Sequence, residues 1–541
     1  MNFNEISYNR IDFFEFEKKY RSILDRINDA SRFEDIKTSI SDLNIVRNHV
    51  ETMKTVAEIR YSINTNDKFY IDENKFWNEY EPLILDLDIM FYNCILNSRF
   101  KEEIIEEYGN QFYNLIKCKI DTFSKEVIGL LQEENKLMSE YTELLASAKI
   151  DFDGKVCNLS DLSAYSMNLD EKIRKESIVK HTEFFKKNEE KFDELFDKLV
   201  KLRDNIAKKL GYDNFIELGY KRMSRTDYNS EMVSKLRTKI LERFVPAANK
   251  LYKEQASRIG VDKIDYYNEK IEFSDGNATL IGDQKYIIEK GKEMYSQLSD
   301  ETKEFFEYLI SNELFDVSPR EGKAMGGYCT ILPEYKEPFI FGNFNGTVDD
   351  IDVLTHEAGH AFQVYMSRDI EMPELIFPTL DSCEIHSMSM EFFTYPWMDL
   401  FFGDMSEKYK KYHHDSAVKF LPYGTLVDHF QHIIYEHPNL SPNERKEIWR
   451  DLERKYLPHR DYKDLDLLEC GGYWYRQGHI FKDPFYYIDY VLAQLCALEF
   501  YEDMKHDYKG AWKRYMEICK VGGEYSFLEI VKLAKLENPF E

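Results

Sequence analysis

Apolar residues recur at helical spacing over most of this chain. The clearest example runs from Phe192 to Leu210, where an apolar side chain returns every three or four positions and Gly211 follows as a C-terminal cap. Similar stretches span residues 13–65, 76–146 and 230–258. Proline is scarce, with 14 in 541 residues, as expected when few helices are interrupted. The pattern predicts a mainly α fold.

One stretch has a β pattern instead. Tyr328–Leu332 and Phe339–Phe341 are rich in β-branched and aromatic residues, and a proline-containing turn separates them. We expect a small hairpin that leads directly into the next helix. Its edge would bind a peptide through main-chain hydrogen bonds. The alternative is a purely structural hairpin that covers the core.

The helix predicted over residues 348–367 carries an H-E-x-x-H motif, formed by His356, Glu357 and His360. Histidines four residues apart on a helix face the same side, where two imidazoles hold a zinc ion. Glu357 would act as the general base on the water at that metal. Gly359, inside the motif, indicates a tight approach by another element. The alternative is an accidental motif on a helical scaffold, which predicts no stoichiometric zinc.

A second helix, predicted over residues 380–394, supplies the missing carboxylate. A catalytic zinc ion has three protein ligands as a rule, and Glu384 is our candidate for the third. Glu391 lies two turns further along the same face, and we expect it to accept a hydrogen bond from a ligand imidazole. The neighbouring residues are apolar, so these glutamates need partners. Two solvated glutamates on an exposed face are the alternative.

These segments resemble the thimet-oligopeptidase family of zinc peptidases, most closely its bacterial branch of oligoendopeptidase F and Pz-peptidase. The similarity covers roughly residues 170–530, and the first 170 residues are only compatible with it. The segments that carry it are H-E-A-G-H (356–360), E-I-H-S-M-S-M-E-F-F (384–393), G-N-F-N-G-T (342–347), G-G-Y-W-Y-R-Q-G-H-I (471–480) and P-F-Y-Y-I-D-Y (484–490). The resemblance implies an enclosed cleft that admits oligopeptides and excludes folded proteins.

The last of these segments starts a predicted helix over residues 484–503. Tyr487 and Tyr490 are three residues apart and share a face, and phenolic groups are good donors to a developing oxyanion. The resemblance implies that His479, Tyr487 and Tyr490 stabilise the transition state. The spacing from His479 to the tyrosine pair is one residue shorter than in the animal enzymes, so Tyr486 is an alternative to Tyr487.

No linker or break in composition divides the chain. We therefore expect two helical lobes around a deep substrate cleft, with the small hairpin or sheet next to the H-E-x-x-H helix. The N-terminal helical lobe would span residues 1–170, and the catalytic zincin-type lobe would span residues 171–541.

Composition narrows the partners and the compartment. A net charge of −27 argues against nucleic acid, and no apolar run is long enough for a membrane span. The sequence shows no signal peptide, and its eight cysteines have no CxxC spacing, which favours a reduced, cytoplasmic protein. The oligomeric state is not indicated.

The sequence thus predicts a zinc-dependent oligoendopeptidase that binds one zinc ion per chain and hydrolyses internal bonds of short peptides. Two alternatives stay open: a zinc carboxypeptidase of similar helical fold, and a non-catalytic peptide-binding protein.

Overall fold

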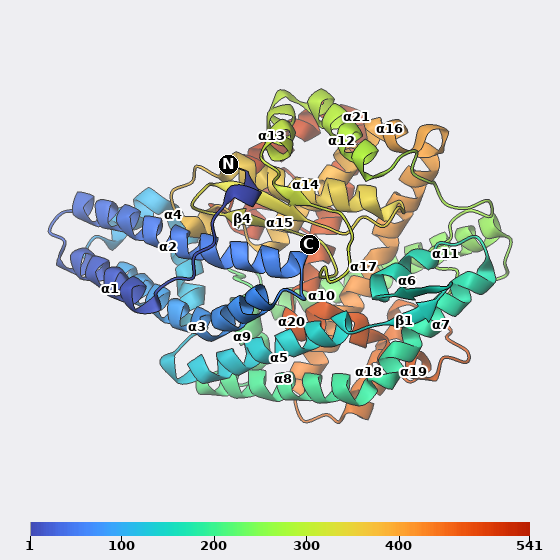
Figure 1. The fold of residues 1–541 in the computed structure, drawn as a ribbon, viewed down its shortest axis with the longest axis horizontal. Helices are drawn as coiled ribbons and strands as arrows, with labels where there is room; N and C mark the ends of the chain where they lie inside the picture. The colour runs from blue at the N-terminus through green and yellow to red at the C-terminus, as the bar shows by residue number, and fades with distance from the viewer. Residues whose placement is uncertain (1) are drawn as a thin grey trace.

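The fold is mainly helical, with one small mixed sheet and one short hairpin (Figure 1). The structure is a computed structural model that describes residues 2–541. The elements of the first half are α1 (Phe13–Asp29), α2 (Phe33–Ile63), α3 (Lys68–Leu96), α4 (Lys101–Asp121), α5 (Ile128–Ala146), β1 (Ile150–Phe152), β2 (Lys155–Cys157), α6 (Leu159–Tyr165), α7 (Glu171–Lys187), α8 (Glu189–Lys209), α9 (Phe215–Arg222), α10 (Ser230–Lys239) and α11 (Val245–Ile259).

The second half carries the sheet and the longest helices. Its elements are α12 (Gln284–Leu298), α13 (Asp300–Ser311), β3 (Phe315–Asp316), β4 (Tyr328–Leu332), β5 (Glu337–Phe341), α14 (Asp349–Ser367), α15 (Leu380–Phe393), α16 (Asp399–Phe402), α17 (Ser406–Glu436), α18 (Pro442–Tyr456), α19 (Asp466–Glu469), α20 (Gly478–Lys482), α21 (Tyr487–Lys520) and α22 (Phe527–Leu533). In Figure 1, α14 and α15 lie near the centre of the molecule, and α1 and α2 extend to one side.

The predicted helical character is confirmed, and several boundaries agree with the sequence pattern. The periodic stretch from Phe192 to Leu210 lies within α8 and the turn after it, and Gly211 adopts the left-handed conformation (φ +88°) of a C-terminal cap. The stretch over residues 13–65 forms two helices instead of one, because α1 ends at Asp29 and α2 begins at Phe33.

The predicted hairpin is the antiparallel pair of β4 and β5, in which Tyr328 is opposite Phe341 and Thr330 is opposite Phe339. The strand order is β3-β5-β4, so β4 is an edge strand. The two-residue strand β3 pairs in parallel with β5, and it is too short to leave a period-two signal in the sequence. All of β5 is buried, whereas most of β4 is only partly buried. An edge of this kind is open to a further strand.

The N-terminal helices are joined to the segment that leads into β4. The end of α2 accepts a backbone hydrogen bond from Ala324 N–H at Ser62 O (2.7 Å), and Thr65 N–H donates to Gly322 O (2.6 Å). One apolar core contains residues from Phe3 to Phe540. The division into lobes at residue 170 stays a prediction. Among residues 2–541, none of the helices combines the length and apolar character that a membrane span requires. All eight cysteines are free thiols.

Helices α14 and α15 touch at a glycine. A Cβ atom added to Gly359 would lie 2.7 Å from the carbonyl oxygen of His386 and 2.7 Å from the Cα of Ser387, both in the backbone of α15. These distances are too short for a real side chain, so the approach of the two helices requires glycine here. The tight approach expected from the sequence is therefore present, and the neighbour is the helix that carries Glu384.

The start of α21 differs from the sequence prediction. The predicted helix began at residue 484 and ended at 503, whereas α21 begins at Tyr487 and runs to Lys520, with non-helical angles at Asp507. The late start follows from Phe485, whose φ of +70° cannot continue a helix. Its N–H donates to the side chain of Gln431 on α17 (2.8 Å), a tertiary contact that the local sequence does not reveal.

We predict that Gly359→Ala destabilises the protein, because the added methyl group must push α14 and α15 apart. Overpacking of this kind costs about 1–3 kcal/mol. Gly129→Ala is the matched control, because Gly129 also lies in a helix and an added Cβ there meets nothing within 4 Å. Thermal unfolding followed by circular dichroism should show a lower midpoint for Gly359→Ala and an unchanged or higher midpoint for Gly129→Ala. Equal midpoints would show that the helix contact yields easily.

Candidate metal centre

Three side chains from two helices converge on one point. His356 and His360 lie one turn apart on α14, and Glu384 reaches them from α15. Glu384 Oε2 lies 3.3 Å from His356 Nε2 and 3.4 Å from His360 Nε2. Within residues 2–541 these three residues form a group whose ligand atoms all lie within 4.8 Å of one another.

The spacing of this group fits a tetrahedral zinc ion. Ligands bonded at about 2.0–2.1 Å to one tetrahedral centre lie about 3.3–3.4 Å from each other, which matches the separations of Glu384 Oε2 from the two imidazole nitrogens. Burial alone would raise the pKa of the Glu384 carboxyl, but His360 and His356 hold it well below its usual range. Glu384 is thus an ionised, buried carboxylate, and two imidazoles with one carboxylate make a typical donor set for catalytic zinc.

A second layer of hydrogen bonds fixes the orientation of His356. Its Nδ1–H donates to Glu391 Oε1 (2.6 Å), which leaves Nε2 directed at the ligand group. The other oxygen of Glu391 accepts from His413 Nε2 (2.6 Å), and His413 Nδ1 contacts the Tyr395 hydroxyl (2.7 Å). Sequence reasoning found Glu391 but missed His413, because His413 lies on α17 and no spacing connects it to the motif.

Glu357 directly follows His356 on α14. It is 6% exposed, and its Oε2 atom has no hydrogen-bond partner among residues 2–541. Burial raises the pKa of this carboxyl. A Cβ atom at Gly327, just before β4, would lie 3.0 Å from Glu357 Oε1. The backbone at the edge strand therefore passes directly beside the carboxylate.

His479 and Tyr490 lie together beside Tyr486, whose hydroxyl contacts Glu384. The Tyr490 hydroxyl is 3.4 Å from His479 Nε2, and the amide nitrogen of Gln477 contacts His479 Nδ1 (2.9 Å). An amide nitrogen only donates, so Nδ1 is the acceptor and Nε2 carries the proton of a neutral ring. Burial lowers the pKa of His479, which favours this neutral form. Both His479 and Tyr490 therefore present polar hydrogens at the site.

The structure separates the two candidates for the remaining tyrosine. The Tyr486 hydroxyl donates to Glu384 Oε1 (2.5 Å), and Tyr486 and Tyr490 are four residues apart with ring centroids 4.9 Å from each other. Tyr487 packs against His479, Phe420 and Tyr423, at 5.1, 5.8 and 5.9 Å between ring centroids. Tyr486 is therefore the tyrosine whose hydroxyl contacts Glu384, and the role of Tyr487 stays a prediction.

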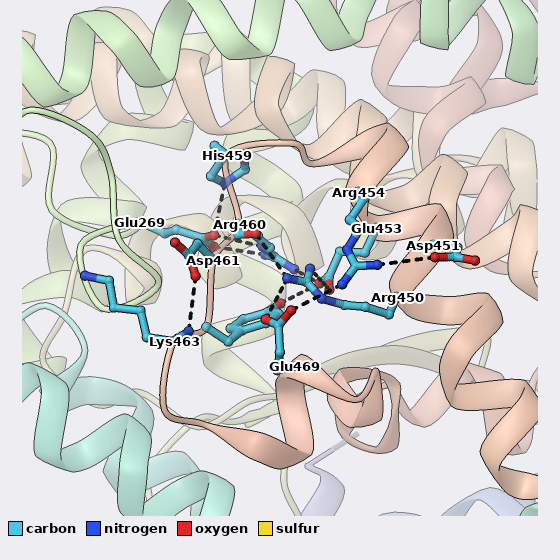
Figure 2. A network of polar contacts seen from close by, with 11 residues as sticks. Glu269, Arg450, Asp451, Glu453, Arg454, His459, Arg460, Asp461, Lys463 and Glu469 are labelled. Carbon is cyan, nitrogen blue, oxygen red and sulfur yellow. Dashed lines mark hydrogen bonds and ion pairs between the residues drawn. The ribbon is translucent and has the colours of Figure 1, made fainter.

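A cavity of about 590 Å³ adjoins this segment. Its wall includes Phe420, Tyr423 and Gln477, which also contact Tyr487. The cavity therefore lies beside residues 477–479, the turn that carries His479 (the His479 turn). One wall carries a charged network, shown in Figure 2, in which Arg460 lies between two glutamates. Arg460 forms two hydrogen bonds to Glu269 (2.8 and 2.9 Å) and one to Glu453 (3.1 Å).

Two family descriptions match most of the chain. "Peptidase M3 N-terminal domain" matches residues 3–123, and "Peptidase family M3" matches residues 164–541. The chain is 24% identical over 458 residues to an oligoendopeptidase F homologue of Borreliella burgdorferi, which covers 78% of this chain and 75% of the relative. It is 21% identical over 523 residues to oligopeptidase PepF of Bacillus subtilis, which covers 89% and 74%.

A solved structure is closer in sequence. Pz peptidase A, determined with an inhibitor, is 49% identical and superimposes with a TM-score of 0.98 over 100% of this chain and 96% of its own. The helical architecture and the small sheet are therefore shared with a known peptidase.

We predict that Glu391→Ala weakens zinc binding, because His356 loses the acceptor that orients its ring. Loss of such a hydrogen-bond partner lowers metal affinity about 10- to 100-fold. Competition with a chelator, followed by metal analysis, measures this directly and needs no activity assay. Glu304→Ala is the control, since Glu304 also accepts a side-chain hydrogen bond, here from the Tyr365 hydroxyl, but lies on α13. An unchanged zinc affinity in Glu391→Ala would contradict the orienting role.

Proposed function

The chain belongs to peptidase family M3, and on this premise we propose that it is a zinc-dependent oligoendopeptidase that hydrolyses internal bonds of short peptides. Its class, a metalloendopeptidase, follows from the family. The proposal adds the metal, the residues and their roles. The observation that carries it is the convergence of His356, His360 and Glu384 beside the unpartnered carboxylate oxygen of Glu357.

We propose that His356, His360 and Glu384 hold one zinc ion. When bound, zinc would polarise the scissile carbonyl and lower the pKa of the attacking water. Glu391 keeps the His356 ring in the orientation that a metal needs. Tyr486 holds Oε1 of Glu384, which keeps Oε2 directed at the two imidazoles. The cytoplasm remains the compartment that we expect, since the reduced cysteines suit it.

Glu357 is the proposed general base. Its free oxygen takes a proton from the water that attacks the peptide carbonyl, and it then delivers that proton to the departing amine. Burial raises the pKa of Glu357, and a carboxylate with a raised pKa takes a proton from water more readily than one fully exposed to solvent. The substrate backbone would lie along β4, whose edge begins beside Glu357.

His479 and Tyr490 are the proposed donors to the oxyanion. Both lie against Tyr486, whose hydroxyl contacts Glu384, and the contact between His479 and Tyr490 is a long 3.4 Å. Preorganised donors of this kind stabilise charge that develops during the reaction. The Tyr486 hydroxyl already donates to Glu384, so we assign it the role of orienting this proposed zinc ligand.

We predict that Glu357→Gln abolishes peptide hydrolysis and keeps zinc. The amide cannot accept a proton, and loss of a general base lowers kcat/KM about 10²- to 10⁴-fold. Mass spectrometry of a decapeptide blocked at both ends provides the assay, because an endopeptidase cuts internal bonds and a carboxypeptidase finds no free end. Glu407→Gln, at a side chain that is 82% exposed, is the control. Wild-type rates in Glu357→Gln would overturn the assignment, and a wild-type enzyme that leaves the blocked peptide intact would favour the carboxypeptidase.

We predict that Tyr490→Phe lowers kcat more than Tyr487→Phe. Removal of one oxyanion donor costs about 10²- to 10³-fold in kcat. Tyr487→Phe removes only a hydrogen bond to Gln477, so its effect should stay below about tenfold. Steady-state kinetics on the same decapeptide compare the two variants, which lie one turn apart on one helix. Equal losses would return the donor role to Tyr487.

A further inference from the structure

The cavity beside the His479 turn contains one positive charge that no carboxylate neutralises. The cations that line it are Lys270, Lys419, Arg460 and Arg476. Three of them have carboxylate partners: Lys270 with Asp349, Lys419 with Glu272, and Arg460 with Glu269. Arg476 has no ion-pair partner among residues 2–541. Arg476 is partly buried, and its charge is available to an anionic ligand in the cavity.

Arg476 is held by neutral groups. Its Nη2 donates to His181 Nδ1 (2.7 Å), and its guanidinium lies 4.6 Å from the ring centroid of Tyr473. Burial, together with the charge of Arg476, lowers the pKa of His181 well below its usual range, so the imidazole is neutral. An imidazole and a phenol ring fix the position of the guanidinium, yet they leave its full charge available to a ligand in the cavity.

The position of Arg476 connects it to the proposed reaction. It is the last residue of the short 3₁₀ segment Gly472–Arg476, and the next residue, Gln477, contacts the ring of His479. Arg476 lies three positions before His479, so their Cα atoms lie at most about 11 Å apart. An extended peptide advances about 3.3–3.6 Å per residue. A group bound by Arg476 would therefore lie only a few residues from the bond that is cut.

We propose that Arg476 binds a carboxylate of the peptide substrate in this cavity while the scissile bond lies at the metal group. The guanidinium fork matches a carboxylate through two parallel hydrogen bonds, which gives selectivity as well as affinity. This inference rests on the proposed peptidase function and names a substrate class, short peptides with a carboxylate near the cleaved bond. The carboxylate has two possible sources, the chain end and an acidic side chain, and the two are tested separately.

The test compares matched peptides on the zinc-loaded enzyme, with products measured by liquid chromatography and mass spectrometry. The first pair is an N-acetylated hexapeptide without ionisable side chains, as the free acid and as the carboxamide. The second pair is the carboxamide with Asp or Asn as its last residue. We expect kcat/KM to be about tenfold higher for the carboxylate member of at least one pair, mainly through KM. Ratios near one in both pairs would overturn the proposal.

Variants of Arg476 test whether this side chain causes the ratio of kcat/KM between the two peptides of a pair. Arg476→Gln should bring it to within twofold of one, and Arg476→Lys should retain part of it, because lysine keeps the charge and loses the fork. A ratio cancels any general loss of activity from a disturbed turn, since both peptides meet the same enzyme. Arg454→Gln, at an arginine that is 58% exposed on α18, should keep the wild-type ratio. A wild-type ratio in Arg476→Gln would refute the role of Arg476.

A longer peptide separates the chain end from other causes. Six neutral residues added at the carboxyl end of the hexapeptide should abolish the preference for the free acid, because the terminal carboxylate then lies beyond the reach of Arg476. A preference that survives this extension would contradict binding near the cleaved bond. Failure of the underlying peptidase function would look different, because neither member of any pair would be hydrolysed.

Discussion

The site depends on a carboxylate that water does not solvate. Glu384 is 1% exposed, and an ion removed from water costs several kcal/mol unless other groups replace its hydration. The groups that do so come from separate elements: two imidazoles of α14, the hydroxyl of Ser387 one turn along α15 (2.8 Å), and the hydroxyl of Tyr486 before α21. Each must arrive within hydrogen-bond distance, so the packing of the three elements is dictated by one charge. Gly359 makes that packing possible, because it lets the backbone of α15 approach α14.

The same constraint explains why the supporting layer extends so far. Glu391 holds the ring of His356, but Glu391 is itself a carboxylate that is only 12% exposed, and a single imidazole satisfies only one of its oxygens. His413 on α17 satisfies the other, and Tyr395 contacts the second nitrogen of His413. Burial alone would lower the pKa of His413, but Glu391 and Asp352 raise it, which favours a cation between two carboxylates. The ring of His356, a proposed metal ligand, is thus oriented through three successive side chains.

The parts of this arrangement that repeat locally could be predicted from the sequence, and the parts that tertiary contacts decide could not. Helical periodicity places His356 and His360 on one face and Glu384 in line with Glu391, because both relations depend only on the helix. Which tyrosine faces Glu384 depends on the positive φ of Phe485, whose N–H bonds to a side chain of α17. No propensity of Phe485 itself favours that conformation, so the register of Tyr486 and Tyr487 could be fixed only by the three-dimensional structure. The contact of His413 with Glu391 is likewise tertiary, because His413 lies on α17, and no local pattern in the sequence predicts it.

The free charge of Arg476 has to be weighed against a chain with a net charge of −27. Such a surface repels acidic peptides at long range, but salt screens exposed charges over roughly 8–10 Å. Inside the cavity the nearest charged groups determine whether an anion binds. The two glutamates of the cavity wall, Glu269 and Glu272, are already paired with Arg460 and Lys419. A substrate carboxylate would therefore gain little electrostatic attraction while it approaches the protein, and much once it contacts Arg476. Recognition of that kind appears in how long a peptide stays bound more than in how fast it arrives. An acidic exterior and a cationic pocket are thus compatible, because they act at different distances.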